Sequence, residues 1–147
     1  MKMFKTAVIL FFAVLLTGCA STLKTYSGKT LSLDESGVLT CDHFLRIHAV
    51  DGNPELKISS GGGLWFRDCA VSLTPGPHTV TFQYYTGGTV SFSTGSVTRS
   101  FNVEKGNIYR IKNAFEGKLW KPYIEKLQGE ELQEQRIRVK EKFAEAK

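Results

Sequence analysis

The stretch 73–85 reads LTPGPHTVTFQYY, and its pattern decides the fold of the chain. Apolar and polar side chains alternate through its second half, and the apolar positions are Val80, Phe82 and Tyr84. This period of two predicts a strand that buries one face. Just before it, Pro75 presets φ and Gly76 tolerates a positive φ, which predicts a type II turn over 74–77. The chain is therefore expected to build its core from strands joined by tight turns.

Short runs of the same kind continue on both sides, from Leu31 to Leu127, and turn signals separate them. The expected strands cover 38–50, 56–59, 69–73, 78–85, 90–92, 97–103, 108–112 and 120–127. Seven or eight strands with a turn about every 8–12 residues are typical of sandwiches. The sequence therefore predicts a mainly β chain that folds as a single β-sandwich.

Individual residues refine these strands. Leu45, Ile47 and Ala49 are expected to share one face of the strand that contains them. The loop 104–107, Glu-Lys-Gly-Asn, is expected to be the loop of a hairpin. Pro122 cannot donate to a strand ladder, so the last strand is expected at the edge of a sheet.

The amino-terminal segment carries an export signal. Lys2 and Lys5 precede an uncharged apolar run over 7–16, and the sequence LTGC stands at 16–19. A helix over that run would be about 15 Å long, half the hydrocarbon thickness of a bilayer, which indicates an export signal rather than a membrane span. A cysteine at this position indicates bacterial lipoprotein processing, in which Cys19 is lipidated and becomes the first residue of the mature protein. The alternative is an ordinary signal peptide that contains a cysteine.

These features divide the chain into four segments. They are a lipoprotein signal peptide over 1–18, a lipidated tether over 19–30, a β-sandwich domain over 31–127 and a charged helical tail over 128–147. Two or more acyl chains on Cys19 would hold the protein on a membrane. Ala20 and Ser21 follow the cysteine in place of the aspartate that retains lipoproteins at the inner membrane. The expected location is the bacterial outer membrane, with the domain on its periplasmic face rather than on the cell surface.

Charge and motifs exclude several functions. Without residues 1–18 the chain keeps 17 basic and 14 acidic side chains, and so mild an excess gives no support for a nucleic-acid partner. Neither a phosphate-binding Gly-x4-Gly-Lys loop nor a Gly-x-Ser-x-Gly elbow occurs, and the glycine run 61–63 is expected to be a turn. His43, His48 and His78 lack the spacing of a catalytic triad and are expected to be structural or solvated. We therefore expect a protein that is not an enzyme and has no cofactor.

Two cysteines remain in the mature domain. Cys41 and Cys69 form an even pair in an oxidising compartment, which predicts a disulfide. The alternative is a metal site formed by Cys41, His43 and His48. Strand alternation places His48 on the face opposite the other two, so the disulfide is preferred and no metal is expected.

Cations and aromatic residues gather near the end of the domain. A binding surface is predicted at Arg110, Lys112, Lys118, Trp120, Lys121 and Tyr123. Such mixtures suit anionic glycans, lipid headgroups or acidic protein surfaces. The alternative is a last strand whose aromatic side chains pack inward while its lysines are solvated.

The tail 128–147 has helical composition, with glutamates first and lysines and arginines later, which complements a helix dipole. Its apolar residues are Leu132, Ile137, Val139 and Phe143. They are not expected to form a continuous stripe, so a solvated polar helix is predicted, with a partner-binding segment as the alternative.

Several motifs together resemble a known group. Leu73-x-Pro-Gly-x-His78 precedes Phe101-x-Val103-x-x-Gly106, and Trp120-x-Pro122 follows. With these motifs the chain resembles a group of small uncharacterised proteobacterial lipoproteins over about residues 25–127. The resemblance implies a lipid anchor and a PEGA-like or transthyretin-like sandwich, of the general immunoglobulin-like kind. It implies no functional residue.

The sequence thus predicts a membrane-anchored periplasmic lipoprotein that acts as a non-catalytic binding or envelope-structural module. Its expected partners are the membrane, through the N-terminal lipid, and an envelope protein or glycan. Two alternatives stay open: an inhibitor of lysozyme-like or other hydrolases, and a hydrolase whose site is unrecognised.

Overall fold

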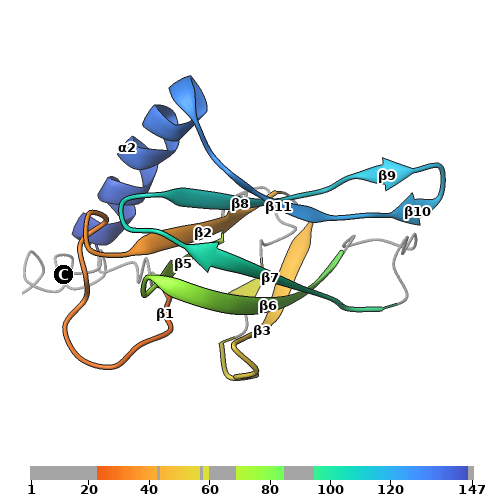
Figure 1. Ribbon diagram of the computed structural model, residues 1–147, viewed down its shortest axis with the longest axis horizontal. Coiled ribbons are helices and arrows are strands. Elements are labelled where there is room, and N and C mark those ends of the chain that lie inside the picture. The colour runs from red at the N-terminus through yellow and green to blue at the C-terminus, as the bar shows by residue number, and fades with distance from the viewer. Residues whose placement is uncertain (1–22, 43, 57, 60–68, 85–94, 146–147) are drawn as a thin grey trace, which may run out of the picture.

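The computed structural model describes residues 23–42, 44–56, 58–59, 69–84 and 95–145 (Figure 1). The predicted lipidation signal, His43 and the expected strand 90–92 lie outside these residues. The elements are β1 (Leu23–Lys24), β2 (Gly37–Cys41), β3 (Leu45–Val50), β4 (Ile58–Ser59), β5 (Ala70–Leu73), β6 (Gly76–Tyr84), β7 (Val97–Val103), β8 (Ile108–Lys112), β9 (Phe115–Glu116), β10 (Leu119–Trp120), β11 (Tyr123–Lys126) and α2 (Gly129–Glu145).

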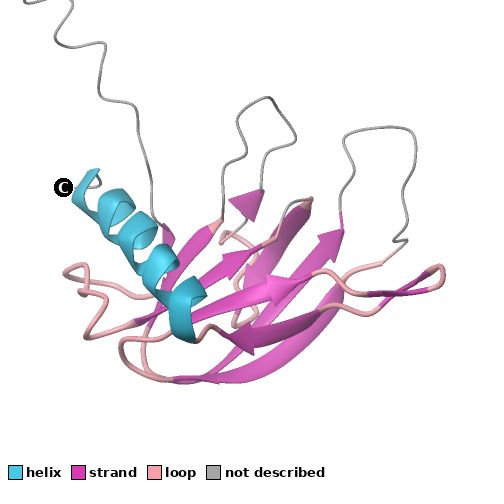
Figure 2. Ribbon diagram, turned by 90° about the horizontal axis from the view of Figure 1, so that it is seen from above, coloured by secondary structure: helices cyan, strands magenta, loops and turns pink. Residues whose placement is uncertain are grey.

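Two sheets pack face to face. One has five strands in the order β1-β5-β2-β8-β11, and the other has four in the order β4-β3-β6-β7. Apolar side chains from both sheets fill the space between them, among them Leu39, Ile47, Val71, Phe82 and Ile111. Helix α2 lies on the outer side of the five-stranded sheet (Figures 1 and 2). The predicted fold class, a mainly β sandwich with a C-terminal helix, is confirmed.

The stretch that decides the fold forms one of the two inner strands of the four-stranded sheet. β6 pairs with β3 on one side and with β7 on the other, both antiparallel. Val80 and Phe82 are fully buried, as their alternation predicts. Gly76 has φ of +130°, a conformation that side chains with a Cβ rarely adopt, so glycine is required at this point. The turn between Leu73 and Gly76 carries the chain from β5 in one sheet to β6 in the other.

The expected long strand over 38–50 is wrong. The chain ends β2 at Cys41, passes through Phe44 with φ of +63°, and enters β3 in the opposite sheet. A bulge in β3, between Ile47 and Ala49, then shifts the alternation by one residue. Val50 rather than Ala49 is therefore fully buried with Ile47.

The loop 104–107 is not the loop of a hairpin, which corrects a second expectation. It joins β7 to β8, and these strands lie in different sheets. Gly106 adopts φ of +73°, and the backbone N–H of Glu104 donates to the hydroxyl of Tyr109 over 3.0 Å. This bond ties the loop to the start of β8, the strand that follows the loop. Pro122, in contrast, is where it was predicted: it precedes β11, which is an edge strand.

Residues 23–30, which were predicted as part of the tether, contact the folded domain. Leu23 and Lys24 form β1, which pairs with β5 in parallel. The backbone N–H of Thr25 donates to the carbonyl of Ser72 over 3.2 Å. The hydroxyl of Tyr26 hydrogen-bonds the hydroxyl of Ser72 over 2.9 Å and accepts the N–H of Leu31 over 3.0 Å. Residues 23–31, which we call the strap, therefore belong to the folded domain.

The helix is present as predicted, but it is not simply solvated. Val139 is 2% exposed, and Leu132 packs with it on a second apolar cluster. This cluster contains Leu33, Val38, Ala70, Ile108 and Leu127, so it occupies the outer face of the five-stranded sheet. Arg136 adds bonds to the carbonyl of Gly106 and the carboxylate of Asp34, at 2.9 and 3.0 Å. Within the described residues, no helix is long and apolar enough to cross a membrane.

Candidate interaction surface

The strands β8, β9, β10 and β11 form one long two-stranded ribbon. The partners Tyr109↔Lys126 and Glu116↔Leu119 mark its ends, and all four strands keep the same register between them. The N–H of Lys121 donates to the carbonyl of Ala114 over 2.8 Å, which bridges the gap between the two named ladders. The end of the ribbon extends beyond the sandwich, at the right of Figure 1.

A two-residue turn closes this ribbon. Gly117 and Lys118 connect the paired residues Glu116 and Leu119. Gly117 has φ of +59°, which is the glycine conformation at the first central position of a type II′ turn. This hairpin was not predicted from the sequence. Its signal is a Gly-x pair between two short alternating runs, and the short length of β9 and β10 makes that signal weak.

Burial alternates strictly at the end of the ribbon. Trp120 and Pro122 are buried, whereas Leu119, Lys121 and Tyr123 are exposed. Since alternate residues of extended chain share a face, the three exposed side chains stand in line on the outer face of the ribbon. We call these three residues the outer row. The side chains are 59% exposed for Leu119, 54% for Lys121 and 47% for Tyr123.

The predicted binding residues divide into three groups. Arg110 and Lys112 share the outer face of the ribbon with the outer row, but both side chains pair with a carboxylate of α2. Arg110 forms an ion pair with Glu131 of the helix. Lys112 lies 3.3 Å from Glu131 and 3.2 Å from Glu125. These two cations therefore hold the helix against the sheet.

The pKa of Lys112 reflects this position. Partial burial alone would lower the pKa of its ammonium group. Hydrogen bonds to Glu125 and Glu131, together with their charges, outweigh the burial and raise the pKa above its ordinary value of 10.5. Lys112 is therefore a fixed positive charge of the helix contact.

Trp120 points the other way, into the sandwich. Its indole N–H donates to the side-chain oxygen of Asn113 over 3.0 Å. Its ring lies 6.0 Å from that of Phe82 and 5.9 Å from that of Tyr84. Tyr84 in turn contacts Phe115 at 5.5 Å. The inward packing that the sequence left as an alternative therefore applies to Trp120 but not to Tyr123.

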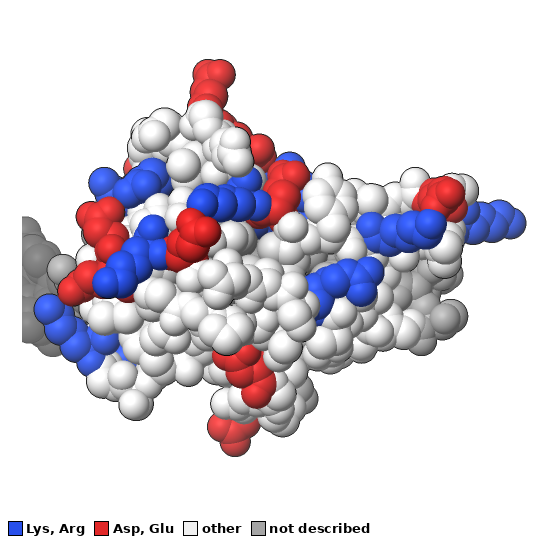
Figure 3. Space-filling view, viewed as in Figure 1, with Lys and Arg blue, Asp and Glu red and all other residues white. Residues whose placement is uncertain are grey.

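Lys118 and Lys121 remain at the end of the ribbon. Lys121 forms an ion pair with Glu116 across the hairpin. Lys118 lies in the turn and has no carboxylate partner among the described residues. Figure 3 shows positive groups on both sides of one negative group at this end of the molecule. The structure thus places Lys118 beside the outer row and leaves Trp120, Arg110 and Lys112 out of it.

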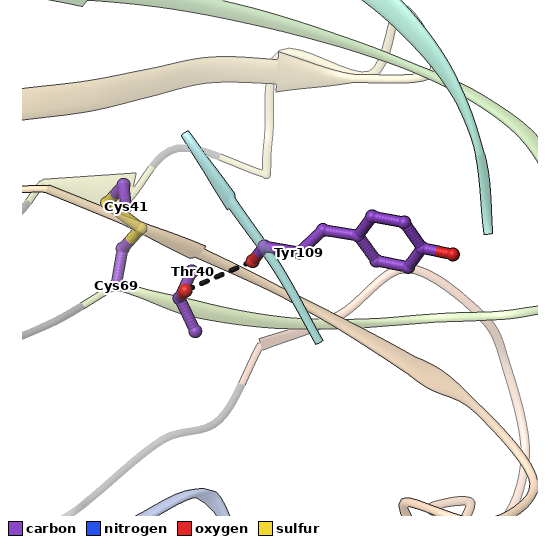
Figure 4. Close-up of a disulfide and its surroundings, with 4 residues drawn as sticks. All are labelled: Thr40, Cys41, Cys69 and Tyr109. Atoms are coloured by element: carbon purple, nitrogen blue, oxygen red, sulfur yellow. Dashed lines mark hydrogen bonds between the residues drawn. A yellow bond between two sulfur atoms is a disulfide. The ribbon is translucent and has the colours of Figure 1, made fainter. Parts of the chain in front are cut away.

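The cysteine pair lies at the base of the same ribbon. Cys41 and Cys69 are at disulfide distance, with their Cα atoms 5.6 Å apart, which confirms the predicted pairing. The neighbouring Thr40 donates its hydroxyl to the carbonyl of Tyr109 over 3.0 Å (Figure 4). The disulfide joins the end of β2 to the residue that precedes β5, and Thr40 joins β2 to β8.

Two histidines can be placed. His78 is 8% exposed; its Nδ1 lies 2.6 Å from the carboxylate of Asp51 and its Nε2 lies 2.7 Å from the carbonyl of Thr74. His48 hydrogen-bonds the side-chain oxygen of Gln83 over 3.0 Å. Among the residues that the structure describes, no group of three potential metal ligands comes together. Both histidines hold neighbouring segments of the four-stranded sheet. Comparison with known proteins adds no relative: no family model, curated protein or solved structure matches this chain.

Proposed function

We propose that this protein is a lipoprotein, anchored through Cys19 to the periplasmic face of the bacterial outer membrane. There its sandwich acts as a non-catalytic binding or envelope-structural module. The anchor is supported by the LTGC sequence at 16–19 after a charged and then apolar leader. The domain itself gives no comparable sign of chemistry, because the described histidines are engaged in contacts within the sheet.

One observation carries the binding role. The outer row exposes an aliphatic, a cationic and an aromatic side chain in a line, at the end of a ribbon that extends beyond the core. Exposed apolar side chains that are grouped together and rimmed by polar residues are typical of interaction sites.

The test uses intact cells that express the full chain. Labelled palmitate should be incorporated into the wild type and not into Cys19→Ser. A photo-crosslinking residue, p-benzoylphenylalanine, is then introduced at Leu119 or, as a matched control, at Ile137 on α2, since these two side chains are 59% and 61% exposed. A binding module should give covalent products at Leu119 and not at Ile137. Equal or absent products at Leu119 would refute the binding role, and an unlabelled wild type would refute the anchor.

A further inference from the structure

We propose that the outer row, together with Lys118, binds a carboxylate-bearing glycan polymer of the cell envelope. This inference rests on the proposed function, because it places the domain in the envelope by means of its anchor. Three features of the described residues support it: the shape of the row, its chemistry, and its position relative to the strap.

The shape favours a long ligand. Alternate residues of a strand are about 6.7 Å apart, so the outer row is about 13 Å long. Its three side chains are each about half exposed and stand on the surface of a ribbon. Small ligands are usually bound in concave sites that bury most of their surface. A straight and open row instead suits a ligand that is itself extended and that makes several modest contacts.

The chemistry favours a sugar polymer with acidic groups. A pyranose ring has a face of C–H groups that packs on aromatic and aliphatic side chains, such as Tyr123 and Leu119. Its hydroxyls suit the phenol of Tyr123. Carboxylates on the sugars or on attached peptides pair with ammonium groups. Lys118 has no carboxylate partner within the described part of the chain, so its ammonium group is the one offered to such carboxylates. Lys121 stands between the two apolar members of the row and pairs with Glu116.

The position of the strap directs the row away from the anchoring bilayer. β1 and β11 occupy opposite edges of the five-stranded sheet, four strand spacings apart. At about 4.8 Å for each spacing, the two edges are separated by about 19 Å. Only three residues stand between Cys19 and Leu23, and a chain of that length reaches at most about 14 Å. The proposed anchor thus holds the β1 edge near the membrane, while the outer row lies at the opposite edge of the sheet, so it can reach the aqueous envelope where glycan polymers are located.

The experiment measures co-sedimentation of the processed lipoprotein, in detergent, with isolated protein-free peptidoglycan sacculi. Wild-type protein should sediment with the sacculi. Leu119→Ser should weaken binding about tenfold, which corresponds to about 1.4 kcal/mol. Lys118→Gln should weaken it about two- to threefold and reduce its dependence on salt. Amidation of the carboxylates on the sacculi should weaken binding of the wild type in the same way.

Matched variants on α2 provide the controls. Ile137→Ser makes the same change as Leu119→Ser at equal exposure, and Lys140→Gln does so for the charge. Both should bind like the wild type, and all four variants should keep the urea midpoint of unfolding because the substituted side chains are exposed.

Three results would overturn the inference: equal binding of Leu119→Ser and Ile137→Ser, wild-type protein that does not sediment, or full binding to amidated sacculi. Crosslinks from Leu119 to a protein or a lipid, without binding to sacculi, would overturn the glycan as the ligand and leave the proposed binding role standing. The absence of any crosslink would refute the binding role itself.

Discussion

Gln135 lies on the face of α2 that packs against the five-stranded sheet, between Leu132 and Val139, and it is only 8% exposed. Its side-chain amide has no hydrogen-bond partner among the described residues, unlike the buried hydroxyls of Thr40 and Ser72. Burying a polar group without a partner costs about 1–3 kcal/mol. The amide of Gln135 therefore weakens the contact between helix and sheet.

We expect Gln135→Leu to raise the free energy of unfolding by about 1–2 kcal/mol, because an apolar side chain of similar size removes the buried amide. Urea unfolding measures the change. Gln133→Leu is the matched control on the exposed face of the same helix, and it should change stability by less than about 0.5 kcal/mol. A lower midpoint for Gln135→Leu would show that the amide has a partner.

His78 is buried like Gln135, but each of its ring nitrogens faces an oxygen acceptor. Asp51 also accepts the backbone N–H of Thr79 over 2.8 Å, so the pair joins the turn after β3 to β6. His78→Phe should lower the free energy of unfolding by about 1–3 kcal/mol, because it removes both bonds from a buried site. His48→Phe, with a single bond to Gln83, should cost less than about 1 kcal/mol. Equal losses for the two variants would contradict this role of His78.

At the scale of elements, the helix contact depends on pH through Lys112. The folded protein raises the pKa of this side chain, so it holds the proton more tightly than the unfolded chain does. The stabilising contribution is therefore complete below the ordinary value of 10.5 and is lost as the pH rises through the folded value. Lys112→Met should be less stable than the wild type at pH 8, and the two should converge as the pH rises above 10.5. Urea unfolding of both proteins over this range makes the comparison; a constant difference would mean that packing, and not charge, is responsible.

The elements also show what the sequence could and could not predict. Alternation along 79–84 predicts β6 because one face of this strand packs against the opposite sheet, where Val80 and Phe82 are fully buried. Alternation says nothing about which sheet a strand joins, so the sheet changes at Phe44 and over 104–107 were missed. The docking of α2 was missed because Leu132 and Val139 are seven residues apart, and the polar residues Gln135 and Arg136 lie between them on the packed face.

The candidate surface, like the elements, was predicted only in part from the sequence. Residue types around Trp120 indicated a binding surface, and the structure places five of the six predicted residues on the outer face or in the turn of the ribbon. Two of these five, Arg110 and Lys112, form ion pairs with Glu131 of α2. The register of the ribbon then decides which side chains are free, since it turns Trp120 inward and puts Arg110 beside Glu131. Leu119, the most exposed of the outer row, could have been found from Gly117-Lys118 as a hairpin turn, but not from charge or aromatic content.

At the scale of the whole molecule, the disulfide limits the freedom of the unfolded chain. Cys41 and Cys69 are 28 residues apart, and closing a loop of this size stabilises a fold by about 3–4 kcal/mol in the chain-entropy estimate. The double variant Cys41→Ala/Cys69→Ala should lose about this free energy of unfolding. Thermal or urea unfolding measures it, with reductant as an independent route to the same state. A wild type whose midpoint does not respond to reductant would contradict a disulfide in the purified protein.

If Cys19 is lipidated as proposed, the strap sets how far the whole domain stands from that residue. Among the described residues its polar contacts with the rest of the domain are few: the two paired residues of β1, the N–H and the hydroxyl of Thr25 on the carbonyl of Ser72, and the Tyr26 hydroxyl on the hydroxyl of Ser72. The Tyr26 hydroxyl also accepts the N–H of Leu31 within the strap. Tyr26→Phe removes that hydroxyl and leaves the Leu31 N–H and the buried Ser72 hydroxyl without it. The strap should then open locally, and hydrogen exchange at Thr25 and Leu31 should quicken about tenfold for each 1.4 kcal/mol lost, while exchange in β6 is unchanged.

Release of the strap should also change the position of the domain on a membrane. With 23–31 detached, the chain between Cys19 and Ser32 spans up to about 45 Å instead of about 14 Å. In proteoliposomes that carry the lipoprotein, energy transfer from a dye at the end of the β9–β10 hairpin to dyes in the bilayer should therefore be weaker and more broadly distributed for Tyr26→Phe. Tyr123→Phe is the control, because its hydroxyl is on the opposite edge of the sheet. Unchanged transfer despite faster exchange at Thr25 would mean that other contacts, and not the strap, hold the domain close to the bilayer.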